Sequence, residues 1–260
     1  MLALVGYIVA AGVRIIGTSS RAVGVLADVG MWVGLLAHFA GLAHMASVAH
    51  VMPVHTTSAS LAFLASVIGL GAALTRLAAR NKVLSGVLVS LAAVTQGVSM
   101  LLPQEHPPDP EAVLATFWLP FHALGVFGGM AAFACAFGVS CIFLVVRRRL
   151  KAKDFTALGR LPSLEGLDVW NTRFVVFGFL ALTIGIATGG AWASARGGGS
   201  GLGPTVWITL VSWGWYAVAV LVRVVGGWRG RLAALFSVLG FSGLVISLGA
   251  VIVILQGWHG

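Results

Sequence analysis

Long apolar runs recur along the whole chain, and they constrain its fold more than any other feature. Crossing a ~30 Å hydrocarbon core takes about 20 apolar residues, and eight runs are candidates for such a span. They are Leu2–Ile16 (the shortest), Val29–Ala49, Ala59–Thr75, Val83–Leu102, Phe121–Val146, Phe174–Ala193, Thr205–Val224 and Leu232–Leu255. The chain is 59% hydrophobic and only 9% charged. The sequence therefore predicts an all-α fold, a polytopic membrane bundle of about eight transmembrane helices, with residues 1–260 forming a single integral membrane domain.

The basic residues are distributed asymmetrically between the loops. Fifteen of the sixteen lysines and arginines fall in one alternating set of loops, and only Arg196 falls in the other. Short basic loops beside apolar spans mark the cytoplasmic side. We therefore expect a multi-pass protein of the cytoplasmic (inner) membrane, with both termini on the non-cytoplasmic side. The net charge of +9 belongs to these loops and does not indicate nucleic-acid binding.

Six of the seven histidines fall near the opposite, outer edge of the bundle. His38 lies at mid-span, where an ionisable residue is expected to be functional. His44 and His50 lie six residues apart, so one helix points them about 120° apart and does not supply a two-histidine site. A site needs histidines from different spans. His122 and His259 are the natural pair, because both emerge from spans at the outer level.

Neutral imidazole is a good ligand for haem iron, zinc and copper. No cysteine, methionine or acid cluster at ligand spacing accompanies the histidines, which argues against a structural zinc or soft copper site. Cys135 and Cys141 form no CxxC pair and indicate neither a disulfide nor a metal site. The pattern favours a metal or a metallated cofactor held by histidines at the outer edge. For His50, His55 and His106 the simpler interpretation is a polar residue at the membrane interface.

Other polar positions have plainer interpretations. Asp28 is interpreted as a helix N-cap at the inner end of the second span rather than as a proton relay. The segment Lys151–Asn171 is expected to be a long cytoplasmic connection with a short turn at Pro162. A hydrolytic enzyme is not indicated, because the chain shows no HExxH motif and no Ser/His/acid arrangement. We expect a protein that is not an enzyme.

Several runs resemble the cytochrome c assembly family, the integral membrane proteins of CcsA, CcmC and HemX-like type that handle haem. The resemblance is carried by Leu161–Ala193 (LPSLEGLDVWNTRFVVFGFLALTIGIATGGAWA), by Trp213 with Tyr216, and by Gly227–Phe241 (GWRGRLAALFSVLGF). Met52–Ala65 (MPVHTTSASLAFLA) is similar to the segment that leads into the family's third span.

The resemblance implies roles for three histidines. Two outer histidines of the family clamp haem iron, and His122 and His259 match their positions. His38 in LLAHF matches a membrane-embedded histidine that receives haem, although His44 or His50 remains an alternative for that role. The family's tryptophan-rich W-x-W-D-P loop is replaced by Gly197–Gly203, and the second embedded histidine aligns with Leu221. The shorter HemX-like branch is therefore the closer comparison.

The leading hypothesis is a haem-binding or haem-handling protein for cytochrome c biogenesis, with a bis-histidine b-type haem near the outer face, bound permanently or transiently. One alternative is a b-type cytochrome, an electron-transfer subunit in which His38 or His44 pairs with His122. A second alternative is a haem-free scaffold subunit of a larger membrane complex. The expected partners are haem, the lipid bilayer and another membrane protein of a cytochrome assembly or respiratory complex.

Overall fold

The chain folds as a bundle of long α-helices. A computed structural model describes residues 1–16, 21–49, 52–54, 56–78, 82–102, 118–153, 162–195 and 203–257. Within these ranges there is no strand, and the helices are α1 (Leu2–Ile16), α2 (Arg21–Ala49), α3 (Thr57–Ala78), α4 (Lys82–Leu101), α6 (Trp118–Lys151), α7 (Leu164–Ala195), α8 (Pro204–Val224) and α9 (Arg231–Gly257). The all-α prediction is confirmed.

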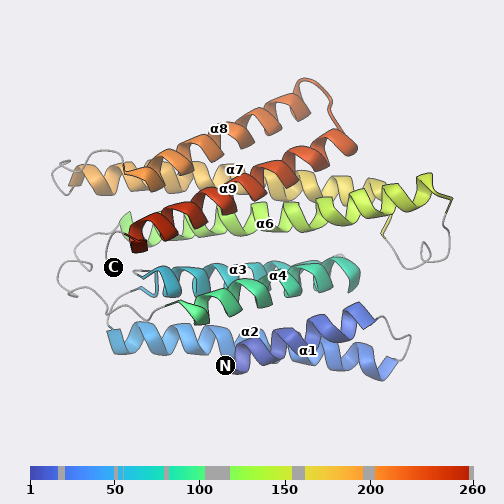
Figure 1. The fold of residues 1–260 in the computed structure, drawn as a ribbon, viewed down its shortest axis with the longest axis horizontal. Coiled ribbons are helices and arrows are strands. Elements are labelled where there is room, and N and C mark those ends of the chain that lie inside the picture. Colours follow the sequence, from blue (N-terminus) through green and yellow to red (C-terminus); the bar gives the residue numbers. More distant parts are fainter. Residues whose placement is uncertain are drawn as a thin grey trace.

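The helices α2 to α9 are seven candidate membrane spans by length and apolar composition. Helix α1 has 15 residues, which gives a length of about 22 Å and falls short of a ~30 Å core. It begins partway along α2 in Figure 1. The multi-pass architecture is confirmed, and the side of the membrane on which each terminus lies stays a prediction.

Consecutive helices alternate in direction, so the ends of neighbouring helices lie together at the two ends of the bundle (Figure 1). The ends of α3, α6 and α8 that carry Arg76, Arg148 and Arg223 lie together at one end, here named the basic end. His122, in the first turns of α6, lies at the opposite end. The charge asymmetry of the sequence therefore becomes an asymmetry between the two ends of the bundle.

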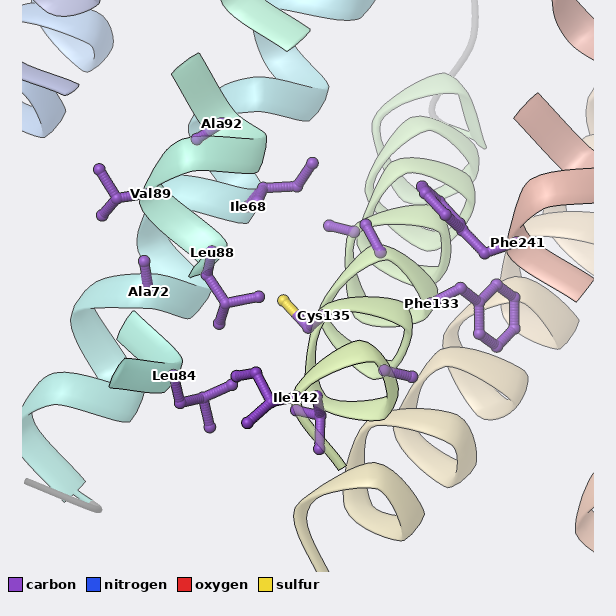
Figure 2. Close-up of a cluster of buried hydrophobic side chains, with 14 of the residues drawn as sticks. Ile68, Ala72, Leu84, Leu88, Val89, Ala92, Phe133, Cys135, Ile142 and Phe241 are labelled. Carbon is purple, nitrogen blue, oxygen red and sulfur yellow. The ribbon is translucent and has the colours of Figure 1, made fainter. Parts of the chain in front are cut away.

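The bundle has two halves that meet along α6. Helices α1 to α4 form one half, and α6 to α9 form the other (Figure 1). Figure 2 shows Cys135 and Ile142 of α6 directed toward Leu84 and Leu88 of α4, which are both fully buried. On the other face of α6, the ring of Phe133 lies against α7, where a Cβ atom at Gly178 would be 2.6 Å from it. Helix α6 is therefore the central element of the hydrophobic core.

Helix α7 begins earlier than the sequence indicated. The expected connection Lys151–Asn171 is wrong in its second part, because α7 is already helical from Leu164. The Ser163 hydroxyl accepts a hydrogen bond from the Gly166 backbone N–H at 3.1 Å, as an N-cap residue does. This additional helix carries polar side chains into the basic end of the bundle.

The expected role of Asp28 as an N-cap is also wrong. Asp28 lies within α2, which begins at Arg21. Its carboxylate accepts two hydrogen bonds from the Arg76 guanidinium of α3, at 2.9 and 2.7 Å. The aspartate therefore ties α2 to α3 near the basic end.

Candidate functional site

His122 is held against helix α7 by a hydrogen bond to the backbone. Its Nδ1 lies 2.7 Å from the Gly185 carbonyl oxygen. The carbonyl oxygen only accepts, so His122 donates the Nδ1 proton. The same oxygen also accepts a bond from the Thr188 hydroxyl at 3.1 Å. The imidazole is partly buried and fixed in orientation by this contact.

Glycines in α7 make room for the imidazole. A Cβ atom at Gly189 would lie 2.7 Å from His122 Nδ1 and 2.8 Å from its Cε1, closer than side-chain contacts allow. One turn away, a Cβ at Gly125 would lie 2.6 Å from the Gly185 Cα. Small residues allow helix backbones to approach closely in a membrane. The α6–α7 contact therefore brings the ring of His122 onto the backbone of α7.

The Gly185 contact also sets the chemistry of the imidazole. In a neutral ring that donates from Nδ1, the lone pair is on Nε2. Metal-ligating histidines commonly donate their other ring N–H to a backbone carbonyl, which fixes tautomer and orientation. The donor set at His122 therefore fits an axial ligand of haem iron.

His38 lies in a different environment, in the interior of the α1–α4 half. Its side chain is only 4% exposed, as expected for a mid-span residue. Its Nδ1 lies 3.3 Å from the hydroxyl oxygen of Tyr7 on α1. The Gln96 side chain of α4 and the carbonyl of Ala62 on α3 also approach the imidazole. His38 therefore sits among four helices rather than on the surface of the bundle.

The other predicted ligands are placed differently. His44 is exposed, so it does not share the buried environment of His38. His259 lies outside the described residues, as do His50, His55 and His106, and the pairing of His122 with His259 stays a prediction. Within the described ranges, no group of three or more histidine, cysteine or acidic residues is arranged to hold a metal ion.

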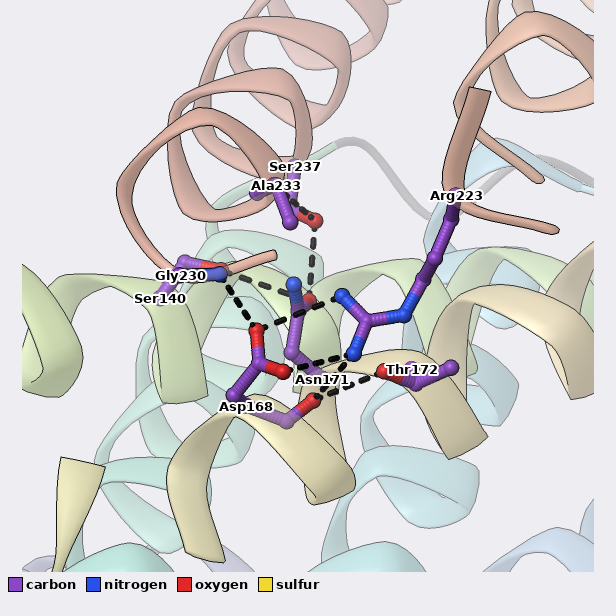
Figure 3. Close-up of polar contacts among 8 residues, drawn as sticks. All are labelled: Ser140, Asp168, Asn171, Thr172, Arg223, Gly230, Ala233 and Ser237. Carbon is purple, nitrogen blue, oxygen red and sulfur yellow. Dashed lines mark hydrogen bonds and ion pairs between the residues drawn. The ribbon is translucent and has the colours of Figure 1, made fainter. Parts of the chain in front are cut away.

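A cluster at the basic end was not identified as a site from the sequence. Figure 3 shows the Asp168 carboxylate of α7 facing the Arg223 guanidinium of α8. The two are joined by contacts of 2.7 and 3.2 Å, and the same carboxylate accepts the Gly230 backbone N–H at 2.8 Å. Gly230 directly precedes α9. One carboxylate therefore connects three helices.

Asn171, one turn further along α7, forms the second part of this cluster. Its side-chain oxygen accepts hydrogen bonds from the hydroxyls of Ser237 on α9 at 2.9 Å and Ser140 on α6 at 3.3 Å (Figure 3). A cavity of about 20 Å³ lies beside it, lined in part by Arg223 and Trp228, and this is the volume of one water molecule. Such a cavity does not accommodate an organic cofactor, so the cluster is a helix clamp.

The clamp uses the same runs that carry the family resemblance. Asp168 and Asn171 come from LPSLEGLDVWNTR, and Gly230 ends GWRG. Gly227 and Gly230 have φ angles of +62° and +69°, a left-handed conformation that favours glycine. The aromatic positions of the resemblance are also structural, because Tyr216 is fully buried and stacks on Phe133 with ring centroids 3.5 Å apart.

These features define a polytopic helical membrane protein with a backbone-bound histidine at one end and a polar helix clamp at the other. The sequence matches the Cytochrome C assembly protein family over residues 14–259. The chain belongs to that family, as the runs Leu161–Ala193 and Gly227–Phe241 led us to expect.

Three curated relatives illustrate the similarity. Cytochrome c biogenesis protein CcsA of Trieres chinensis is 37% identical over 89 residues, which is 34% of this chain and 28% of the relative. The protein of the same name from Marchantia polymorpha is 33% identical over 92 residues, 35% of this chain and 29% of the relative. That of Gloeobacter violaceus is 33% identical over 105 residues, 40% of this chain and 31% of the relative. The matched part spans less than a third of each relative, and the expected closer likeness to the HemX-like branch stays a prediction.

Proposed function

We propose that this protein binds haem near the outer face of the membrane for cytochrome c biogenesis, with His122 as an axial ligand. The observation that carries the proposal is the hydrogen bond from His122 Nδ1 to the Gly185 carbonyl oxygen, at 2.7 Å. It leaves the lone pair on Nε2, the form in which imidazole binds iron. Membership of the Cytochrome C assembly protein family supports haem as the cofactor.

The second axial ligand in this proposal is His259, which follows the last span in the sequence. Bound b-type haem would supply an iron centre that takes two axial imidazoles. His38 is the proposed embedded ligand, because it is buried and its Nε2 has no hydrogen-bond partner among the described residues. In this proposal the basic end faces the cytoplasm, as the positive-inside rule predicts, and His122 lies toward the other side of the inner membrane.

We further propose a haem carrier rather than an enzyme that attaches haem to apocytochrome. The position aligned with the family's second embedded histidine is Leu221, which is 60% exposed on α8. The tryptophan-rich loop is replaced by Gly197–Gly203. The partner in this role is another membrane protein of a cytochrome assembly or respiratory complex.

The electron-transfer alternative needs a ligand of α2 opposite His122. The positions of the two candidate ligands on α2 argue against this pairing. His38 contacts Tyr7 of α1, and His44 is exposed. The scaffold alternative predicts a protein that purifies without haem.

Optical spectra of the purified protein test the proposal. We expect a pyridine haemochrome of b-type and a Soret band that is lost or shifted in His122→Ala and in His259→Ala. His44→Ala is the matched control, because it removes an exposed imidazole from the same bundle. A wild-type protein without haem after reconstitution, or a Soret band unaffected by both substitutions, would contradict the proposal.

A further inference from the structure

Three polar side chains from three helices meet in the interior of the α1–α4 half. They are Tyr7 of α1, His38 of α2 and Gln96 of α4, with exposed fractions of 0%, 4% and 9%. Polar groups at this depth in a membrane protein are costly unless they pair with one another. The hydrogen bonds that these three side chains form with one another therefore decide how they are accommodated.

The contacts on the two sides of the imidazole differ. On one side, His38 Nδ1 lies 3.3 Å from the Tyr7 hydroxyl oxygen. His38 Nε2 and the Gln96 side-chain oxygen, in contrast, are both buried and have no hydrogen-bond partner among the described residues. The Gln96 side chain is nevertheless close enough to the imidazole to interact with it, as is the Ala62 carbonyl.

One arrangement of protons satisfies all three side chains. A neutral imidazole has one N–H donor and one acceptor, a tyrosine hydroxyl has one proton to donate, and an amide oxygen only accepts. If Tyr7 donates to Nδ1, then Nε2 carries the proton and donates to Gln96 after a small rotation of the amide. In the reverse arrangement Nδ1 donates to Tyr7, the buried Tyr7 proton loses this acceptor, and the Gln96 oxygen gains no donor.

Helix α3 fixes the position of the tyrosine. A Cβ atom at Gly69 would lie 2.5 Å from the Tyr7 hydroxyl oxygen, so the absence of a side chain there is what lets the hydroxyl reach His38. Gly6 allows the close approach of α1 to α2, since its Cβ would lie 2.7 Å from the Gly34 Cα. The donor on the Nδ1 side is therefore held by backbone packing.

We propose that Tyr7 and Gln96 are positioning residues that hold His38 in its Nε2–H tautomer, with Tyr7 donating to Nδ1 and Nε2 donating to Gln96. In this tautomer Nε2 has no lone pair for a metal. His38 becomes a ligand only in the Nδ1–H tautomer, in which the Gln96 contact is released and Nδ1–H donates a hydrogen bond to the Tyr7 oxygen. This consequence for haem rests on the proposed function, whereas the hydrogen-bond assignment does not.

The assignment is tested on the haem-free protein in detergent micelles. The ¹⁵N NMR signals of labelled histidine report the tautomer, and His38→Gln identifies the His38 signals. We expect the Nε2–H tautomer in the wild type. Gln96→Leu should change the tautomer ratio toward Nδ1–H by about tenfold, the equivalent of one net hydrogen bond. Gln96→Glu, which retains an acceptor, should keep Nε2–H. A wild-type Nδ1–H tautomer, or a ratio unchanged in Gln96→Leu, would overturn the assignment.

The consequence for metal binding is tested in the His122→Ala protein, which lacks the proposed outer ligand. Haem that this protein still binds is assigned to His38 if the double variant His122→Ala/His38→Ala no longer binds it. Gln96→Leu should tighten haem binding at that site by about tenfold, because the competing contact is removed. If Gln96→Leu leaves the haem affinity unchanged, Gln96 does not limit haem binding by His38. If neither His122→Ala nor His122→Ala/Gln96→Leu binds haem at His38, then His38 is not the embedded ligand. The NMR result still decides the hydrogen-bond assignment.

Discussion

Asp168 binds Arg223 through two contacts of 2.7 and 3.2 Å, and both side chains are 14% exposed. The Arg223 guanidinium also donates to the Asp168 backbone carbonyl at 3.4 Å. Because the carboxylate additionally accepts the Gly230 N–H, the pair fixes the start of α9 as well as the α7–α8 contact. The runs that carry the family resemblance therefore supply Asp168 and Gly230 to a joint between three helices, which Arg223 of α8 completes at the end of the bundle away from His122.

We expect Asp168→Ala to lower the free energy of unfolding by about 2 kcal/mol. The substitution leaves the Arg223 guanidinium and the Gly230 N–H without this partner, and hydrogen bonds to charged groups are worth about 1.5–3 kcal/mol each. Thermal unfolding in detergent measures the loss. Glu165→Ala is the matched control, since Glu165 is an exposed acid in the first turn of the same helix. Equal effects of the two substitutions would refute the clamp.

We expect Gly189→Ala to weaken haem binding through His122 while leaving the imidazole in the protein. The added Cβ would lie 2.7 Å from Nδ1, so the ring has to leave the Gly185 carbonyl. Loss of such an outer hydrogen bond typically reduces metal affinity by about 10–100-fold. Haem titration followed by the Soret band measures the change.

The neighbouring glycine provides the control for this substitution. A Cβ at Gly190 would meet nothing within 4 Å, so Gly190→Ala should bind haem as the wild type does. If Gly189→Ala retains full affinity, the orientation of His122 against α7 does not matter for haem.

The sequence was sufficient to predict the spans because length and apolar composition are local properties. The start of α7 was missed because Asp168 and Asn171 are typical of a loop when read alone. Their partners Arg223 and Ser237 lie 55 and 66 residues away in the chain. The packing of α7 against α8 and α9 gives these polar side chains their partners.

The depth of His38 in the membrane could be predicted from the sequence, but the hydrogen-bond partners of His38 and His122 could not. The depth of His38 follows from its place in an apolar run, and its burial is confirmed. The contact with Tyr7 depends on the absence of a side chain at Gly69 of another helix. Likewise, the Gly185 carbonyl reaches His122 only through the register of α6 on α7. These registers are set by tertiary packing, which a single sequence does not display.

We expect Gly227→Ala to destabilise the protein by about 1–2 kcal/mol. A Cβ there would meet nothing within 4 Å, so the cost is purely that of the left-handed φ of +62°. Gly243→Ala in α9 is the control, because its Cβ would also meet nothing within 4 Å and alanine favours a helix by about 1 kcal/mol. Unfolding midpoints should therefore move in opposite directions. A stabilised Gly227→Ala protein would contradict the observed turn.

We expect Asp28 and Arg76 to be energetically coupled across α2 and α3. Their side chains are 28% and 22% exposed, so a two-point contact in partial contact with solvent should be worth about 1 kcal/mol. A double-mutant cycle with Asp28→Asn and Arg76→Met measures this coupling from the unfolding free energies. A coupling energy near zero would show that the ion pair does not link the two helices energetically.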